Sequence, residues 1–246
     1  MFYFFSNESI LINEAPEIDH KLMYQKRKGK TGLKNMGNTC FMNSVLQCII
    51  HTPSIKEHFL SDPQNELHQN GKELKEIFSK FVKSMWSGKD EWIEPFELKM
   101  KINELNEKYI ELLQYDAAEF LQFFLFSLHE DLNKVIEKPY IPSENVFGVD
   151  LELASKKCWE DFKKREDSFI IDQFYSQFLS CFKCMTPQCR NQSIYFHNYF
   201  LLPLEISNAH NISQQLENFS NPSFINQWSK KFTFSTFIFN FLSQKK

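Results

Sequence analysis

The stretch "GLKNMGNTCFMNSVLQCIIHTP", residues 32–53, joins turn-forming residues, one cysteine and an apolar run in a single segment. The apolar run predicts a helix from Cys40 to about Ile50, with Asn38 or Thr39 as its cap. Cys40 therefore falls where a tight turn passes into a helix. Three interpretations of this position are open: a core residue, a metal ligand or a catalytic nucleophile.

The start of a helix favours a reactive thiol, because unpaired N–H groups and the helix dipole stabilise the thiolate. Gly37 lets the backbone approach a substrate closely, and the amide of Asn35 can donate to a developing oxyanion. These parts suit acyl transfer through a thioester intermediate. The alternative is that Cys40 is a small buried hydrophobe, as most free cysteines are. Cys48, within the apolar helix, is interpreted as a core residue.

The composition is that of a soluble globular protein, because 42% of the 246 residues are apolar and 24% are charged. This length allows one large domain or two small ones. A net charge of −3 provides no basic field, so nucleic acid is not an expected partner. There is no run of about 18 apolar residues and no convincing signal peptide, so we expect no membrane association and a cytoplasmic or nuclear location.

Helical spacing of apolar residues marks two further segments, from about residue 72 to 86 and from 116 to 133. Asp116 and Glu119 are interpreted as the capping pair of the second segment. Residues 134–150, which contain prolines and a glycine, are predicted to form a loop.

The pattern changes in the second half of the chain. After a further helix that ends near Glu166, residues 168–184 and 193–206 are rich in aromatic and branched side chains and are predicted to be extended. The last 15 residues, "FTFSTFIFNFLSQKK", are interpreted as a C-terminal edge strand. Helices followed by strands predict the α+β fold class.

Three stretches resemble the ubiquitin-specific proteases, a family of deubiquitinating enzymes. "GLKNMGNTCFMNSVLQC" is similar to the cysteine box of that family, and "LLQYDAAEFLQFFLFSLHEDLN" resembles its stretch beginning Gln-Gln-Asp-Ala-His-Glu-Phe. The run from "CWEDFKKREDSFIIDQFYSQF" through "FHNYFLLPLEI" is similar to the family's approach to its zinc-binding fingers. The resemblance covers about residues 31–205.

This resemblance implies a papain-like fold with a helical thumb, the start of β fingers and a palm that is largely missing. It implies that Cys40 is the nucleophile, that Asn35 serves the oxyanion hole, and that Asp116 with Gln114 holds the tail of ubiquitin. The expected activity is cleavage after the C-terminal glycine of ubiquitin, with ubiquitin and ubiquitinated proteins as partners. The chain departs from the family pattern at Tyr115 and at Ala118.

The segment from Glu111 to Asn133 carries five acidic residues and no lysine or arginine. An acidic wall of this kind would attract the arginine-bearing tail of ubiquitin. For Glu119, Glu130 and Asp131, however, a solvated helix face is the favoured interpretation.

The six cysteines, at 40, 48, 158, 181, 184 and 189, are expected to be thiols or metal ligands in a reducing compartment. In "CFKCMTPQC" the local spacing pairs Cys181 with Cys184, whereas the family register pairs Cys184 with Cys189. A structural zinc needs four ligands, and no cysteine follows 189, so we expect either an incomplete zinc site or reduced thiols. Catalysis itself needs no cofactor.

A cysteine protease needs a histidine within hydrogen-bond reach of its thiol. The histidines are at 20, 51, 58, 68, 129, 197 and 210, and none has the sequence context of the family's histidine box. His51 and His58 are interpreted as surface residues. No catalytic base is assigned.

The expected organisation is an N-terminal arm or linker at 1–31, a partial catalytic domain at 32–225 and a Phe-rich tail at 226–246. Within the domain, 32–166 forms the thumb and 167–225 starts the fingers. The chain is interpreted as truncated relative to an active ancestor, by a real stop or a gene-model fault, so the tail is suspected to be non-native. The alternatives to a deubiquitinase are an inactive ubiquitin-binding fragment and a zinc-stabilised interaction module.

Overall fold

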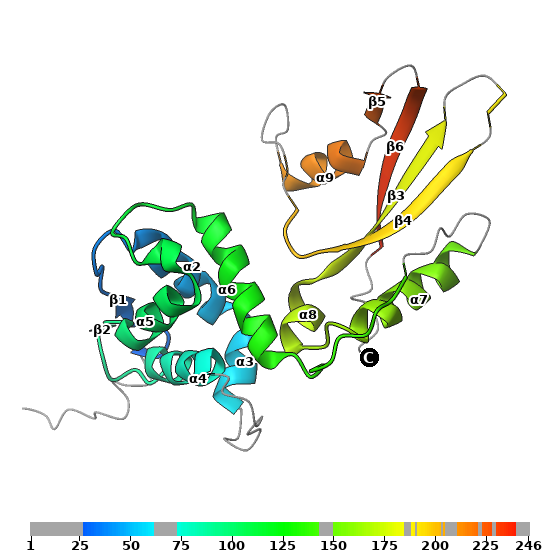
Figure 1. Ribbon diagram of the computed structural model, residues 1–246. Coiled ribbons are helices and arrows are strands. Elements are labelled where there is room, and N and C mark those ends of the chain that lie inside the picture. Colours follow the sequence, from blue (N-terminus) through cyan, green and yellow to red (C-terminus); the bar gives the residue numbers. More distant parts are fainter. Residues whose placement is uncertain are drawn as a thin grey trace, which may run out of the picture.

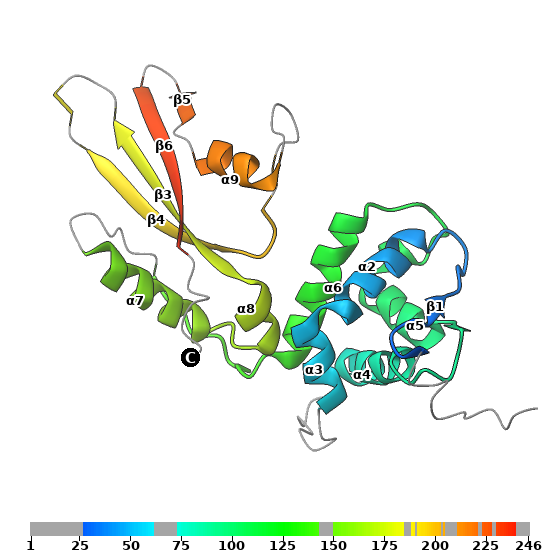
Figure 2. The ribbon, with the colours of Figure 1, turned by 180° about the vertical axis from the view of Figure 1, so that it is seen from behind.

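A computed structural model describes residues 27–61, 73–142, 150–184, 188–189, 191–202, 204, 211–220, 223–227 and 230–239. These residues form two lobes that lie side by side (Figure 1). The helical lobe contains the described residues from 27 to 132, and the sheet lobe contains the described residues from 176 onward together with the helix Leu151–Lys163. The two lobes meet where the end of α6 (Ala117–Leu132) lies against α8 (Phe169–Phe174) (Figure 2).

The helical lobe contains the three predicted helices together with two helices, Pro53–Ser61 and Phe96–Leu105, which the sequence pattern did not predict. Its elements are β1 (Gly32–Leu33), α2 (Cys40–His51), α3 (Pro53–Ser61), α4 (Glu73–Met85), β2 (Trp92–Ile93), α5 (Phe96–Leu105), the short 3-10 helix η1 (Glu107–Tyr109) and α6 (Ala117–Leu132). β1 and β2 pair in parallel. Within the described residues, each helix is too short or too polar to cross a membrane.

Aromatic side chains hold the helical lobe together. Phe59, Phe78, Phe120 and Phe124 are fully buried. The Phe78 ring makes edge contacts with Phe59 at 4.9 Å and with Phe124 at 5.2 Å, which joins α3, α4 and α6. Such edge-to-face pairs add to the stabilisation that comes from burying the rings.

Two predictions of burial in this lobe are wrong. Cys48 is exposed, because the buried side of α2 is formed by neighbours such as Leu46, Ile49 and Ile50. His58 is half-buried rather than on the surface, and its ring stacks on that of Phe169 at 3.9 Å.

The sheet lobe is antiparallel, with the strand order β4-β3-β6-β5. Its elements are α7 (Leu151–Lys163), β3 (Ser176–Cys184), β4 (Gln192–Tyr199), α9 (Ile212–Ser220), β5 (Ser223–Gln227) and β6 (Lys230–Phe239). α7 packs on the sheet through Ala154, which is buried with Leu179 and Ile194. The predicted edge position of the C-terminal strand is wrong, because β6 lies between β3 and β5.

The short helix α8 (Phe169–Phe174) occupies residues that were predicted to be extended. The Oγ of Ser168 accepts a hydrogen bond from the Ile171 N–H at 3.2 Å, which caps this helix. Ile170 and Ile171 are both buried. Packing of these two side chains and the serine cap therefore outweigh the β preference of the local sequence.

Candidate active site

The turn before α2 is built around the side chain of Asn35. Its Oδ1 accepts hydrogen bonds from the N–H groups of Gly37 and Thr39, both at 3.1 Å, and from the Thr39 hydroxyl at 3.2 Å. Gly37 and Asn38 have positive φ angles of 94° and 50°. A left-handed pair of this kind suits glycine and asparagine, which explains the choice of residues.

Cys40 is the first residue of α2, and it is exposed. Thr39 occupies the predicted N-cap position, yet its side chain makes no capping hydrogen bond to the helix. Its hydroxyl accepts from the Met36 N–H at 3.0 Å and so belongs to the turn. The first turn of α2 also contains no acidic residue. Its N–H groups are therefore left to stabilise a thiolate or an oxyanion.

The orientation of the Asn35 amide follows from the hydrogen bonds of its oxygen. With Oδ1 committed to three hydrogen bonds, the orientation of the side chain is fixed. Its Nδ2 makes no hydrogen bond to any residue that the structure describes, so the amide remains able to donate.

A second segment, residues 112–116, lies against this turn. The Asn38 Nδ2 donates to the Leu112 carbonyl at 2.7 Å. A Cβ on Gly37 would come within 3.1 Å of Leu112, so the two segments pack closely. The ring of Phe41 contacts that of Tyr115 at 5.3 Å. The start of α2 and the segment that leads into α6 thus share one corner of the helical lobe.

Asp116 caps α6, as predicted, because its Oδ1 accepts from the Glu119 N–H at 2.8 Å. Asp116 and Gln114 are both exposed beside the cysteine turn. Tyr115, which departs from the family pattern, donates from its hydroxyl to the Lys108 carbonyl and packs edge-on against Tyr109 at 5.2 Å. The change to tyrosine therefore fits the fold and leaves the helix start intact.

The acidic wall is partly neutralised by lysines. The Lys108 ammonium lies 2.5 Å from the Glu119 carboxylate, and the hydrogen bond to Glu119 raises the pKa of Lys108. The Lys138 ammonium lies 2.9 Å from the Glu130 carboxylate. Both acidic residues are thus ion-paired, whereas Asp116 and Glu111 make no ion pair within the described residues.

Two described histidines lie at the far ends of helices that begin at this corner. His51 closes α2, about 16 Å along the helix axis from Cys40. His129 lies about 20 Å along α6 from its Asp116 cap. The remaining histidines are His58 in α3, His197 in β4, and His20, His68 and His210, which fall outside the described residues.

The cysteines of the sheet lobe are divided between two faces. Cys181 and Cys184 are three residues apart on β3, so their side chains point to opposite faces of the sheet. Cys181 packs toward α7 together with Cys158. Cys184 ends β3, and Cys189 lies in the connection to β4. This division separates Cys181 from Cys184, and the expectation of either an incomplete zinc site at Cys184 and Cys189 or reduced thiols stays a prediction.

One cluster of ionisable side chains has no signature in the sequence. Ligand atoms of His129, Glu130 and Glu166 lie within 4.8 Å of one another. The Lys138 ammonium lies 2.9 Å from both carboxylates, so the cluster is an ion-pair network at the junction of α6 and α8. The histidine and Glu166 are 37 positions apart, so only the fold reveals the cluster.

The comparisons with known proteins agree with this geometry. The family model for ubiquitin carboxyl-terminal hydrolase matches residues 31–244. The chain is 36% identical over 188 residues to human ubiquitin carboxyl-terminal hydrolase 15, which covers 74% of the chain and 19% of that protein. It is 37% identical over 187 residues to ubiquitin carboxyl-terminal hydrolase 4 of Mus musculus, and this match covers 72% of the chain and 19% of that protein. The chain thus spans about a fifth of the length of these relatives.

Two solved structures share the fold. The SAGA DUB module of Ubp8, Sgf11, Sus1 and Sgf73 bound to monoubiquitin matches with a TM-score of 0.63 and 20% identity, over 87% of this chain and 46% of that one. The same module bound to ubiquitin aldehyde matches with a TM-score of 0.62 and 23% identity, over 87% of this chain and 45% of that one. The predicted α+β, papain-like fold is therefore confirmed. The chain belongs to the ubiquitin carboxyl-terminal hydrolase family, in its ubiquitin-specific protease group.

Proposed function

We propose that this chain is a thiol-dependent deubiquitinase that hydrolyses the bond after the C-terminal glycine of ubiquitin. The observation that carries the proposal is the exposed Cys40 at an uncapped helix start, beside an asparagine whose amide is fixed in orientation. Membership of the family supports the same chemistry. Ubiquitin as partner is supported by the solved modules of the same fold, which are bound to it.

The proposed reaction begins when the Cys40 thiolate attacks the carbonyl carbon of the terminal glycine. The carbonyl electrons move to its oxygen, where Asn35 Nδ2 and the N–H groups at the start of α2 stabilise the charge. The C–N bond then breaks as the nitrogen takes a proton from solvent water, the amine leaves, and a thioester remains on Cys40. Water hydrolyses the thioester, which releases the ubiquitin carboxylate and regenerates the thiol. No residue is assigned as the base.

The substrate-binding part of the proposal rests on Asp116 and Gln114. Both are exposed in the segment that packs against the cysteine turn. The ubiquitin tail carries arginine, and a carboxylate can bind a guanidinium through two hydrogen bonds. Asp116 has one oxygen engaged in capping α6, so its other oxygen remains to receive the tail.

Two assays on the purified chain test the proposal. A ubiquitin probe with a C-terminal electrophile should label Cys40, and the label should be absent in Cys40→Ser. A fluorogenic ubiquitin substrate should be turned over, and turnover should likewise disappear in Cys40→Ser. Cys48→Ser is the matched control, because Cys48 is an exposed thiol on the same helix. Labelling of Cys48 in place of Cys40 would contradict the proposal.

The second candidate function is ubiquitin binding without turnover. The positions of His51 and His129, about 16 and 20 Å along their helices from the active-site corner, favour it. The same assays separate the two candidates. Labelling without turnover would support the binding fragment, and labelling with turnover would exclude it.

A further inference from the structure

A groove on the outer side of the helical lobe runs between α4 and α5 and has a volume of about 640 Å³. Its apolar lining includes Phe96, Met100 and Ile110, which are 62%, 50% and 55% exposed. Phe96 and Met100 are four residues apart on α5 and therefore lie on the same side of that helix. None of these residues belongs to the site proposed around Cys40.

The border of the groove is acidic. Glu73, Glu97 and Glu104 line it, together with Lys101. The Lys101 ammonium lies 2.7 Å from the Glu73 carboxylate and 3.1 Å from that of Glu104, and its side chain is only 11% exposed. Hydrogen bonding to Glu73 raises the pKa of Lys101, so this lysine keeps its charge. Three glutamates and one lysine leave a net charge of −2 among the described lining residues.

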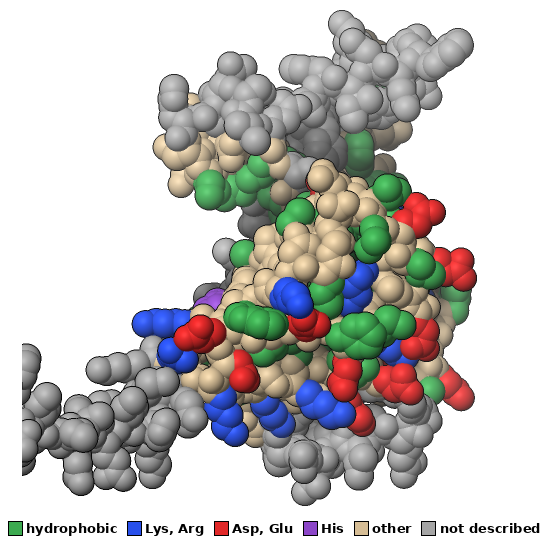
Figure 3. Space-filling model, turned by 90° about the vertical axis from the view of Figure 1, so that its left-hand side faces the viewer, with side chains coloured by type: hydrophobic (Ala, Val, Ile, Leu, Met, Phe, Trp, Pro, Cys, Tyr) green, Lys and Arg blue, Asp and Glu red, His purple; other side chains and the backbone are tan. Residues whose placement is uncertain are grey.

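Glu97 is the carboxylate most open to a partner. It is exposed, and within the described part of the chain it forms no ion pair. It lies next to Phe96 and three residues before Met100 on α5. Figure 3 looks onto the end of the lobe that carries β2 and α5, where exposed hydrophobic side chains lie among Asp, Glu, Lys and Arg side chains.

The walls of the groove decide what form of peptide can bind. α4 and α5 use their backbone groups within their own hydrogen bonds, so the groove offers no strand edge to an extended peptide. A helix satisfies its own backbone groups and can place an apolar face against Phe96, Met100 and Ile110. Lysine or arginine at the sides of that face would meet the glutamates.

We propose that this groove binds a basic amphipathic helix of a partner protein. Its apolar side chains, spaced three and four residues apart, cover the floor of the groove, and its cations face Glu97 and the acidic border. The interaction does not depend on the chemistry at Cys40, so an inactive chain would bind the same helix.

The test is fluorescence anisotropy with a labelled helical peptide of about 18 leucine and lysine residues, with the leucines on one face. Glu97→Lys and Met100→Ser are each expected to weaken binding about fivefold, and the double variant more than tenfold, because a charge contact and an apolar contact are lost. Binding should also weaken as salt is raised. A peptide with glutamate in place of lysine should bind much more weakly.

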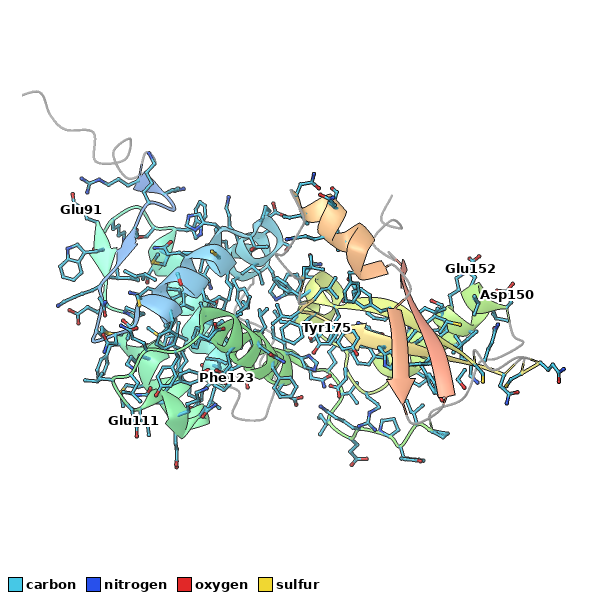
Figure 4. All side chains as sticks on the ribbon, turned by 90° about the horizontal axis from the view of Figure 1, so that it is seen from above. Glu91, Glu111, Phe123, Asp150, Glu152 and Tyr175 are labelled. Atoms are coloured by element: carbon cyan, nitrogen blue, oxygen red, sulfur yellow. The ribbon has the colours of Figure 1, made fainter. Side chains whose placement is uncertain are left out.

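The matched control lies at the opposite end of the molecule. Glu152 and Leu153 are exposed neighbours on α7, and Leu153 is 65% exposed. Figure 4 shows Glu152 far from Glu111, which follows Ile110 of the groove. Glu152→Lys and Leu153→Ser should leave binding unchanged, and circular dichroism should show that all variants remain folded.

Four results would overturn the proposal. The first is equal binding of the lysine and glutamate peptides. The second is equal loss of binding in the α7 variants and the groove variants. The third is no saturable binding of the lysine peptide at about 1 mM, the weakest affinity that has practical meaning here. The fourth is self-association of the chain, by sedimentation, that Met100→Ser abolishes, because the occupant would then be a second copy.

Discussion

Asn35 has two roles that a pair of substitutions can separate. In Asn35→Asp an oxygen still accepts from Gly37 and Thr39, but the amide donor is gone. We expect turnover of a fluorogenic ubiquitin substrate to fall about 100-fold or more, which is the typical cost of removing one oxyanion donor. The thermal midpoint of unfolding should stay near that of the original chain.

Asn35→Ala removes the donor and the acceptor together. The N–H of the buried Thr39 then lacks a partner, so the free energy of unfolding should fall by about 1–3 kcal/mol in addition to the loss of turnover. Measuring turnover and the free energy of unfolding in Asn35→Asp and Asn35→Ala separates the role of Asn35 in holding the turn from its role as an oxyanion donor. Normal turnover in Asn35→Asp would remove Asn35 from the mechanism.

Gly37 is required both by its conformation and by its neighbour. Its φ of +94° strains any residue with a Cβ, and an added Cβ would lie 3.1 Å from the Leu112 side chain. Gly37→Ala should therefore lower the free energy of unfolding by about 1–2 kcal/mol, measured by denaturant titration. It should also reduce labelling of Cys40 by an electrophilic ubiquitin probe, because the turn before α2 must shift.

Gly32 provides the matched control for that substitution. It has no positive φ, and an added Cβ would meet its nearest atom, the Glu91 carbonyl oxygen, at 3.4 Å. Gly32→Ala should consequently be tolerated better than Gly37→Ala. If both substitutions cost the same, the left-handed turn is not what makes Gly37 necessary.

The start of α6 combines a structural and a binding role in Asp116. Asparagine caps helices about as well as aspartate, so Asp116→Asn should retain the stability of the helix. It loses the negative charge, and we expect KM for the ubiquitin substrate to rise while the thermal midpoint stays constant. Asp116→Ala should raise KM and also cost about 1 kcal/mol of stability.

Steady-state kinetics and denaturant unfolding on both variants check this prediction. Glu119→Gln is the control, because Glu119 lies on the same helix but is already paired with Lys108. An unchanged KM in Asp116→Asn would show that the charge does not hold the ubiquitin tail.

The predictable elements are those with a strong local signal. The apolar spacing after Cys40 and the acidic cap at Asp116 marked α2 and α6 within one residue at the start of each helix. α8 was missed because aromatic and branched residues at 168–174 suggest a strand, whereas buried Ile170 and Ile171 hold them in a helix. Local propensity does not contain that tertiary packing.

The turn before α2 was predictable to a similar degree. Cys40 and Asn35 are five residues apart, so the turn-forming residues between them predict the local structure without any long-range contact. The pairing of Lys108 with Glu119, and of Lys138 with Glu130, depends on how loops return to α6. Such contacts of α6 with lysines outside it leave no pattern in the sequence. They neutralise two of the five acidic residues between Glu111 and Asn133, namely Glu119 and Glu130.

The two lobes are held together by a polar junction. His129 is buried, with Nδ1 2.7 Å from the Ser168 hydroxyl and Nε2 2.9 Å from the Glu166 carboxylate. The Asn133 Nδ2 donates to the same carboxylate at 3.1 Å, and Lys138 lies 2.9 Å from it. These contacts connect the end of α6 with the start of α8, which leads directly into the sheet lobe (Figure 1).

Glu166 should make this junction sensitive to acid. Burial alone would raise its pKa, but hydrogen bonds from Lys138 and His129 outweigh burial and lower the pKa. Because the folded pKa lies below the unfolded one, the stabilisation is present above the ordinary glutamate pKa of about 4.3 and is lost as pH falls through the lower folded value. Glu166→Gln should therefore destabilise the chain near pH 7 and lose this effect in acid.

Denaturant unfolding across pH measures that difference, with the exposed Glu152→Gln as control. The free energy gap between the original chain and Glu166→Gln should narrow as the pH falls below about 4.3, whereas Glu152→Gln should show little gap at any pH. A gap for Glu166→Gln that stays constant into acid would mean that its carboxylate charge does not hold the lobes together. The junction would then depend on the contact of His129 with Ser168.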